Sequence, residues 1–318
     1  MATCRIGTRG SALALWQARH IAARLTSLHP VLAIEIVEIV STGDRVMDVP
    51  LSDVEGTGFF TSTIERALLD GRVDVAVHSH KDLPVAATAG LRVAAVPVRG
   101  PVQDVLCARD GLTLATLPPG SRLGTCSARR TAQVRAVRDD LDLQPLRGNV
   151  PTRVGRVTGG ELDAIILAHA GLDRLGLQNH ISGIFSLAAM LPAPAQGALA
   201  VQCRAADVEL AERLAALDDA DTRQAVEAER TVLHALGGGC SVPVGALAVS
   251  DGGRLTLRAG VFALDGTRVV RAEAMGIDPT AVGEAVARRL LDEGAGAILA
   301  DFEKIARLEW PEPSAAEA

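Results

Sequence analysis

The chain has 318 residues, of which 48% are hydrophobic and 22% charged, which is typical of a soluble globular protein with two or three domains. A net charge of −6 and an aromatic content of 2% argue against nucleic acid or an anionic membrane as a general partner. No apolar run is long enough to span a membrane. Any anion site must therefore come from a local basic cluster.

The first hundred residues alternate between strand and helix patterns. Residues 5–7 form a predicted strand, and Ser11 is placed to cap the helix that follows. Further strands are predicted at 32–40, 73–77 and 92–96, with a helix at 61–70. The strand at 73–77 ends at the sequence HSHKD, and open α/β sheets place ligand-binding groups at the carboxyl ends of their strands.

A connector bracketed by Pro97 and Pro101 leads into a second unit of the same kind. Its predicted elements are strands at 105–108, 122–124, 143–146 and 163–167, and a helix at 128–138. A second proline-rich connector, residues 191–195, precedes a strand at 197–202 that returns to the first unit. Two such crossings predict two lobes with a cleft and a hinge between them.

The pattern changes near residue 218. A predicted helix at 222–236 is followed by three strands joined by Asp-Gly turns, at 244–249, 254–263 and 268–275, and by two helices, at 281–292 and 297–307. This order predicts a small α+β domain with a three-stranded antiparallel sheet.

The predicted fold class is therefore α/β, with two doubly wound lobes resembling periplasmic binding proteins and a small α+β C-terminal domain. The predicted division is 1–98 with 197–217 for lobe 1, 99–196 for lobe 2, 218–310 for the third domain and 311–318 for a tail.

Residues 237–245 (GGGCSVPVG) connect a predicted helix to a predicted strand. Three glycines before Cys240 let the backbone turn sharply and let a large group approach it closely. Taken alone, the stretch is equally well explained as a glycine-rich turn with an incidental cysteine.

The five cysteines are odd in number and lack CxxC spacing: Cys4, Cys107, Cys126, Cys203 and Cys240. This pattern supports neither a disulfide framework nor a zinc site. The first residues also lack the apolar core of a signal peptide. We therefore expect free thiols and a cytoplasmic protein.

Seven basic residues stand in predicted loops or at predicted helix starts: Arg9, Lys81, Arg129, Arg130, Arg147, Arg153 and Arg174. Residues 124–130 (GTCSARR) and 146–153 (LRGNVPTR) each follow a strand and open a helix, so backbone N–H groups and guanidinium groups meet there. A surface salt bridge explains any one of these arginines. Together, in an acidic protein, they favour a ligand with several carboxylate or phosphate groups.

Asp82 follows Lys81 directly, and neighbouring cations keep such a carboxylate ionised. It can then hold a cationic intermediate or an N–H group and pass a proton, although a turn-capping role is the structural alternative. His78 and His80 lie on one side of an extended segment, but no carboxylate or cysteine has useful spacing to them, so no metal site is predicted.

These motifs resemble those of the porphobilinogen deaminase (hydroxymethylbilane synthase) family. The resemblance covers residues 5–307 and rests on seven motifs in family order, at 7–17, 78–84, 124–130, 146–153, 170–176, 194–198 and 237–245. It implies a transferase that condenses four porphobilinogen units head to tail on a covalent dipyrromethane primer, with loss of ammonia. Hydrolysis then releases linear hydroxymethylbilane for tetrapyrrole and heme biosynthesis.

The resemblance also implies roles for individual residues. Cys240 would carry the dipyrromethane through a thioether, and Asp82 would be the catalytic carboxylate. The other cofactor contacts would come from Lys81, Ser127, Arg129, Arg130, Arg147 and Arg153. Substrate contacts would come from Arg9, Ser11, Arg174 and Gln196. The family further implies a monomer that acts on a small molecule, with no nucleic acid, membrane or metal involved.

Three departures from the family pattern keep alternatives open. Residues 53–63 lack the usual lysines and include Glu55, residues 101–104 read PVQD instead of Asp-Pro-Arg-Asp, and Cys126 replaces a common serine. A diverged paralogue, acting on a related pyrrole or in a specialised pathway, is therefore the main alternative. A non-catalytic two-lobed anion-binding protein would have no use for Cys240 or Asp82, and a thiol hydrolase would need a histidine placed beside its cysteine.

Overall fold

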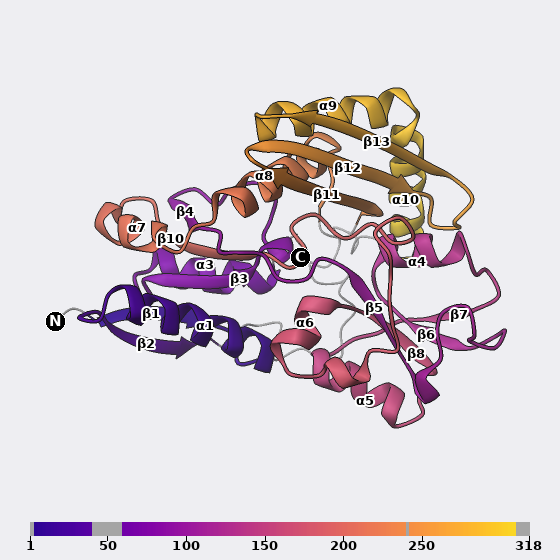
Figure 1. Ribbon diagram of the computed structural model, residues 1–318, viewed down its shortest axis with the longest axis horizontal. Helices are drawn as coiled ribbons and strands as arrows, with labels where there is room; N and C mark the ends of the chain where they lie inside the picture. The colour runs from indigo at the N-terminus through magenta and orange to yellow at the C-terminus, as the bar shows by residue number, and fades with distance from the viewer. Residues whose placement is uncertain (1–2, 40–58, 240–241, 310–318) are drawn as a thin grey trace, which may run out of the picture.

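The computed structural model describes residues 3–39, 59–239 and 242–309, whose strands group into three sheets. Figure 1 shows the two lobes side by side, with the third domain lying across them. Within the described residues, no helix has the length and apolar character needed to cross a membrane. Loop residues 53–58 and the tail 311–318 lie outside the described residues.

The first lobe is built on a five-stranded sheet in the order β2-β1-β3-β10-β4. Its strands are β1 (Thr3–Thr8), β2 (Ala33–Glu38), β3 (Val75–Ser79), β4 (Leu91–Ala95) and β10 (Leu199–Arg204). Its helices are α1 (Ala12–Leu28), α3 (Phe59–Leu69), the 3-10 turn η1 (His80–Asp82) and α7 (Val208–Ala215). Strand β1 pairs in parallel with β2 and β3, whereas β10 runs antiparallel between β3 and β4.

The second lobe repeats this plan with the order β7-β6-β8-β5-β9. Its strands are β5 (Asp104–Ala108), β6 (Arg122–Gly124), β7 (Asp142–Gln144), β8 (Ala164–Ala168) and β9 (Gly183–Ile184). Its helices are η2 (Arg109–Gly111), α4 (Ala128–Arg135), α5 (Val150–Thr158), α6 (His169–Arg174) and η3 (Gln178–His180). Strand β6 is parallel to β7 and β8, and β5 is antiparallel to β8 and β9.

The first crossing carries the chain into the second lobe, and the second crossing returns it to the first lobe as β10. Strand β5 follows the first connector and β10 follows the second, and each occupies the fourth place in its sheet. The connectors also touch, because the Gly100 N–H donates a hydrogen bond to the Gly197 carbonyl at 3.1 Å. Gly197 has a φ of +86°, and a Cβ there would lie 2.6 Å from the Gly100 oxygen. The predicted two-lobed α/β class is confirmed, with two crossings between the lobes.

The third domain has a sheet in the order β11-β12-β13, and both strand pairs are antiparallel. Its elements are α8 (Ala220–Ala235), β11 (Val244–Asp251), β12 (Arg254–Phe262), β13 (Val269–Gly276), α9 (Pro279–Asp292) and α10 (Ala295–Glu309). Helices α8 and α9 pack on this sheet through a core that includes Val232, Leu257 and Val286. The predicted three-stranded antiparallel sheet is therefore confirmed.

Helices α6 and α7 and strand β9 were not predicted as elements. Helix α6 has six residues and β9 only two, so neither contains enough residues to show a hydrophobic period. The returning strand begins at residue 199 and not at 197, because Gly197 still belongs to the tight turn between the connectors. Each of the three predicted domains contains one of the three sheets. The exact boundaries of the domains stay a prediction.

Candidate active site

A cavity of about 100 Å³ lies in the first lobe at the carboxyl ends of strands β1 and β3. We call it the Asp82 chamber. Its polar lining residues are Arg9, Ser11, Gln17, His78, Ser79 and Asp82. This is the sheet edge at which open α/β folds place ligand-binding groups. Asp82, at the end of η1, is exposed, so its carboxylate is accessible to a ligand.

Ser11 has a structural role in this chamber as well as a predicted ligand role. Its Oγ accepts a hydrogen bond from the Ala14 N–H at 3.3 Å, which caps α1 as the sequence predicts. A serine hydroxyl that accepts one bond still has its own proton to donate. Ser11 therefore has a donor that can reach a carboxylate in the chamber.

Lys81 lies half-buried beside the chamber, and its Nζ donates a hydrogen bond to the Gln196 Oε1 at 3.2 Å. Burial lowers the pKa of Lys81 to about 8. The carboxylates of Asp82 and Asp104 oppose this shift, and two nearby guanidinium groups add to it. The amine is therefore charged at neutral pH but loses its proton in mildly alkaline solution.

The predicted ligand residues Arg129 and Arg130 both hold a carboxylate of the protein itself. Asp104, which is fully buried, accepts hydrogen bonds from Arg129 Nη1 at 2.7 Å and from Arg130 Nη2 at 2.6 Å. Burial alone would raise the pKa of Asp104, but the two guanidinium groups outweigh it and hold that pKa far below its usual range. Asp104 was not predicted as their partner.

This cluster still carries surplus positive charge. The single carboxylate of Asp104 balances only one of the two guanidinium groups that bind it. Lys81 lies close enough to interact electrostatically with all three groups. Buried charges interact more strongly than exposed ones because less water screens them. The surplus favours carboxylates in the adjoining chamber. Direct contact of Arg129 and Arg130 with a ligand stays a prediction.

Gln196 joins the two lobes inside this network. Its side chain is completely buried, and its Nε2 donates to the Val102 carbonyl at 2.8 Å and to Asp104 Oδ1 at 3.0 Å. Its Oε1 accepts the bond from Lys81. The amide therefore links Lys81 of the first lobe to Asp104 of the second.

The helix starts of the second lobe supply further predicted ligand residues. Ser127 Oγ accepts from the Arg130 N–H at 3.4 Å and caps α4. Arg153, on α5, donates from Nε to the Gly148 carbonyl at 2.6 Å. Burial and the charge of Arg130 lower the pKa of Arg153, while Cys126 and Asp82 oppose that shift. Arg153 therefore lies within electrostatic range of Asp82.

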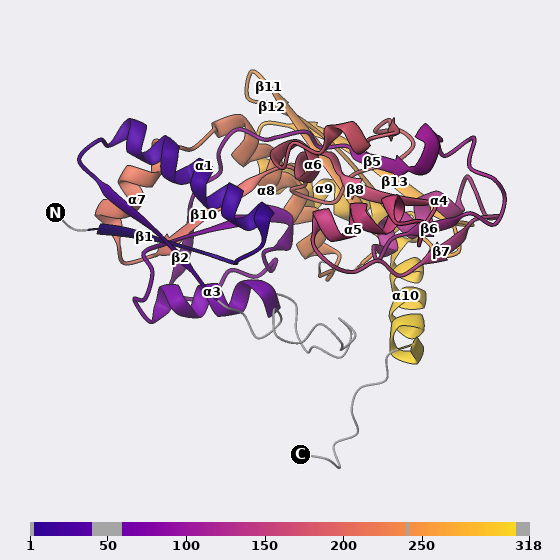
Figure 2. The same ribbon diagram turned by 90° about the horizontal axis from the view of Figure 1, so that it is seen from below.

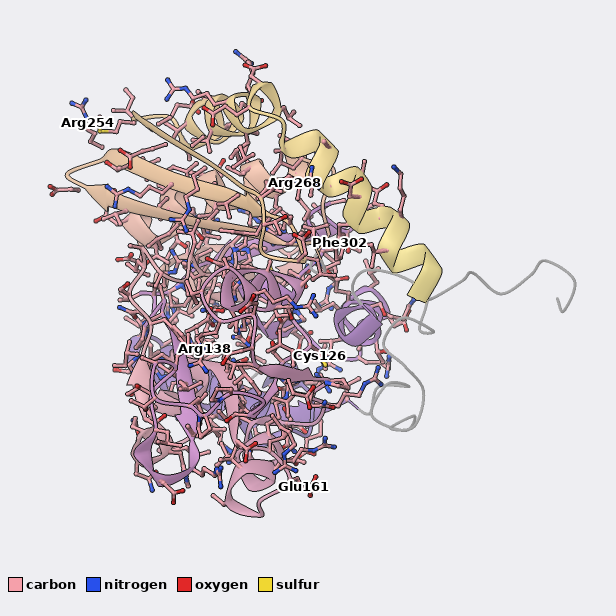
Figure 3. The ribbon with its side chains drawn as sticks, turned by 90° about the vertical axis from the view of Figure 1, so that its right-hand side faces the viewer. Cys126, Arg138, Glu161, Arg254, Arg268 and Phe302 are labelled. Carbon is pink, nitrogen blue, oxygen red and sulfur yellow. The ribbon has the colours of Figure 1, made fainter. Side chains whose placement is uncertain are left out.

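Arg147 and Cys126 lie at the same end of the second lobe. Arg147 is half-buried at the turn before α5. The Cys126 sulfur bonds both the carbonyl and the N–H of Leu146 at 3.0 Å, which ties the end of β6 to the segment after β7. Figure 3 shows Cys126 on the side of the molecule on which α10 lies.

Arg174 does not line the Asp82 chamber but a second cavity beside α1. Its Nη2 donates to the Gly197 carbonyl at 2.6 Å, at the contact between the two connectors. Burial lowers the pKa of Arg174 to about 10, although Asp173 opposes the shift. The guanidinium group stays charged at neutral pH.

Helix α8 of the third domain supplies two supporting residues that were not predicted from the sequence, and the first, Arg230, holds the active-site segment. Arg230 donates hydrogen bonds to the backbone carbonyls of His80, Leu83, Pro84 and Val85, which surround Asp82 in sequence. No local motif marks an arginine that binds distant carbonyls from the middle of a helix.

The second missed residue is Glu229, which is completely buried and forms an ion pair with Arg99 at 2.7 Å. It also accepts from the Ala195 N–H at 2.6 Å and the Ala248 N–H at 2.8 Å. One carboxylate therefore joins both connectors to α8 and β11.

The two motif histidines are buried, and burial lowers the pKa of His78 to about 4. Within the described ranges, no group of three or more metal-binding side chains is found. Because burial lowers the pKa of each ring, both histidines are neutral at physiological pH.

Cys240, the predicted attachment residue, lies outside the described residues, but its flanks are described. Gly237 has a φ of +67°, and a Cβ on Gly238 would lie 2.7 Å from Val242 Cγ2. Only glycine therefore fits this approach to Cys240 without strain.

Two family profiles match the chain. "Porphobilinogen deaminase, dipyromethane cofactor binding domain" matches residues 4–212, and "Porphobilinogen deaminase, C-terminal domain" matches residues 223–292.

Curated relatives agree with these profiles. A porphobilinogen deaminase of Mycolicibacterium gilvum is 49% identical over 307 residues, covering 93% of this chain and 97% of the relative. One from Brevibacillus brevis is 45% identical over 302 residues, covering 95% and 98%.

Among solved structures, a nutrient binding protein from Burkholderia cenocepacia bound to methionine is a distant match. Its TM-score is 0.42 at 13% identity, with 66% of this chain and 89% of that chain covered. The profiles and the curated relatives together span both lobes and the third domain, and the chain belongs to the porphobilinogen deaminase family.

Proposed function

We propose that this chain is a hydroxymethylbilane synthase, which joins four porphobilinogen units head to tail with loss of ammonia and releases the linear product by hydrolysis. The observation that carries the proposal is the exposed carboxylate of Asp82, set in a chamber lined by Arg9 and flanked by Lys81. Family membership supports the same reaction.

A dipyrromethane fits this chain because each of its two pyrrole rings carries an acetate and a propionate. Four carboxylates need several fixed cations, and the site has surplus positive charge around Asp104. We propose that Cys240 holds the cofactor covalently. Its carboxylates would be held by Lys81, Ser127, Arg129, Arg130, Arg147 and Arg153. When bound, the cofactor supplies the free α-carbon to which the first substrate unit is joined.

We assign Asp82 the catalytic role. Its carboxylate accepts a hydrogen bond from the pyrrole N–H of the substrate and stabilises the positive charge that develops on the ring as ammonia leaves. The same oxygen can accept the proton lost when the new carbon–carbon bond forms. Arg230 keeps the Asp82 segment in place by binding the carbonyls around it.

Arg9 and Ser11 are the proposed contacts for the substrate carboxylates in the Asp82 chamber, and Arg174 is the proposed contact for a substrate carboxylate at the cavity beside α1. Gln196 was also predicted to bind substrate. Its side chain is completely buried and bonded at both ends, so we assign it instead to positioning Lys81 against Asp104. It acts on the ligand through Lys81.

Intact-mass analysis tests the covalent cofactor directly. Protein purified from a host that makes porphobilinogen should carry one dipyrromethane adduct, and Cys240→Ser should lack both the adduct and activity. Cys126→Ser is the matched control, because it removes an exposed free thiol from another predicted ligand motif and should leave the adduct in place. Wild-type chain with no added mass would overturn the proposal.

The pKa of Lys81 predicts a pH dependence. Because burial lowers this pKa to about 8, the amine is cationic below that pH and neutral above it, so kcat/KM should fall above about pH 8. Lys81→Arg should extend the profile to higher pH, since guanidinium keeps its proton. Lys304, the only other lysine in the sequence, gives the control Lys304→Arg, which should not move the profile. Superimposable profiles for all three proteins would remove Lys81 from carboxylate binding.

We further propose that the protein works as a cytoplasmic monomer on its small-molecule substrate, without nucleic acid or membrane partners. The net charge of −6 and the four described cysteines, all free, support this setting. We also propose the domain division that the sequence predicts.

A further inference from the structure

A second cavity, of about 590 Å³, lies between α1 of the first lobe and α6 of the second. We call it the α1–α6 cavity. Helix α1 supplies Trp16, Arg19 and His20, and the second lobe supplies Arg174 and Leu175. No residue lines both this cavity and the Asp82 chamber. Figures 1 and 2 show α1 running toward α6 where the lobes meet.

A pair of aromatic rings lines one side of the α1–α6 cavity. The rings of Trp16 and His20 stack, with centroids 4.9 Å apart and an angle of 8° between their planes. The guanidinium carbon of Arg174 lies 5.7 Å from the centre of the Trp16 ring. Aromatic rings with a polar group at their edge bind planar ligands at low entropic cost. The exposed surface of this stacked pair therefore suits a small aromatic ring.

The same cavity has a cationic rim. The Arg19 side chain is exposed, and it forms no hydrogen bond or ion pair with the residues that the structure describes. Arg174 uses one N–H on the Gly197 carbonyl and has others to donate. No aspartate or glutamate is among the lining residues, although Asp173 lies next to Arg174 in sequence. Burial lowers the pKa of His20, and Arg24 and Arg174 lower it further, which shows a local positive potential.

We propose that the α1–α6 cavity binds a pyrrole carboxylate non-covalently, with the ring packed against the Trp16–His20 pair and the carboxylates on Arg19 and Arg174. The volume lies within the ~300–1,000 Å³ range of small-molecule sites. The choice of a pyrrole rests on the proposed function, because the substrate and the linear product are both pyrrole carboxylates. The ligand would span both lobes, so its binding favours the arrangement that brings α1 and α6 together.

The sequence provides a direct probe of this site. It contains two tryptophans, so Trp310→Phe leaves Trp16 as the single tryptophan reporter. The probe is a pyrrole that carries acetate and propionate but no aminomethyl group, so that it cannot lose ammonia. Titrating it into the cofactor-loaded Trp310→Phe protein should change Trp16 fluorescence saturably. Equilibrium dialysis on the same protein should find two probe molecules per chain.

Variants separate the two cavities. Arg19→Gln should weaken the fluorescence response at least tenfold and reduce the stoichiometry to one, while steady-state turnover at saturating substrate is unchanged. Arg24→Gln removes the same charge from the same helix outside the cavity and should shift the response less than threefold. Arg9→Ala, which alters the Asp82 chamber, should leave the Trp16 response in place. Displacement by porphobilinogen alone identifies the substrate as occupant, and displacement by freshly made linear product identifies the product.

Several outcomes would overturn the proposal. A stoichiometry of one together with no saturable response would do so, as would a response that Arg9→Ala abolishes and Arg19→Gln preserves. An equal response to succinate, which has no ring, or to unsubstituted pyrrole, which has no carboxylate, would show that the ligand class is wrong. A normal Trp16 response in a protein without deaminase activity would leave the second site standing and reject the proposed function.

Discussion

Replacing Asp82 with asparagine should lower turnover by about a hundredfold to a thousandfold while the protein stays folded and keeps its cofactor. A preorganised group that stabilises charge in the transition state is worth about that much. The asparagine side chain has nearly the same size but lacks the negative charge that balances the developing positive charge on the pyrrole. Because Asp82 is exposed, the change leaves no buried group without a partner.

Single-turnover kinetics with porphobilinogen, together with intact mass, check this expectation. The control is Asp139→Asn, which makes the same change at an exposed residue of the second lobe and should leave turnover unaffected. Equal rates for wild type and Asp82→Asn would show that another group carries the catalytic charge. A variant that also lost its adduct would place Asp82 in cofactor attachment and not in condensation.

Replacing Glu229 with glutamine should destabilise the protein by about 3–5 kcal/mol, the usual cost of breaking a buried ion pair by removing one partner. The Glu229 side chain is 0% exposed, and its two oxygens serve Arg99, Ala195 and Ala248. A glutamine side chain has one oxygen that can accept hydrogen bonds, and its NH₂ group would face the N–H donors that now bind the second carboxylate oxygen. Urea denaturation followed by circular dichroism measures the loss.

The matched control is Glu209→Gln. Glu209 also pairs with an arginine, Arg213, but its side chain is 81% exposed, so the loss should stay under about 1 kcal/mol. The double variant Arg99→Met with Glu229→Gln should recover part of the stability, because it removes the unpaired buried charge. A loss at Glu229 no larger than that at Glu209 would mean that water reaches the pair.

The fold was largely predictable because its strands and helices are regular and their ends carry strong local signals. Ser11 caps its helix as predicted, and the proline-bearing connectors fall where the chain crosses between lobes. The strand order was not predictable in detail. The residues of β5 and β10 do not show that each strand runs antiparallel to its neighbours, and those of β10 do not show that it completes a sheet whose other strands come from residues 3–95.

The site was predictable where a motif and a strand end coincide, as at Asp82. Its supporting residues were not. Arg129 and Arg130 were recognised as cations, but their partner Asp104 was not, since pairing across a sheet leaves no mark in local sequence. Glu229 and Arg230 sit inside an ordinary helical pattern, and only the tertiary structure shows that they hold the connectors and the Asp82 segment.

The place of β10 has a consequence for biosynthesis on the ribosome. This strand lies between β3 and β4, so the N-terminal lobe cannot complete its sheet until residues 199–204 have emerged. The second lobe takes all its strands from residues 104–184 and can close earlier. The earlier strands of the nascent chain must therefore remain in an incomplete sheet, with apolar faces uncovered, while the later lobe forms. We expect holdase chaperones to bind the incomplete first lobe during this part of synthesis.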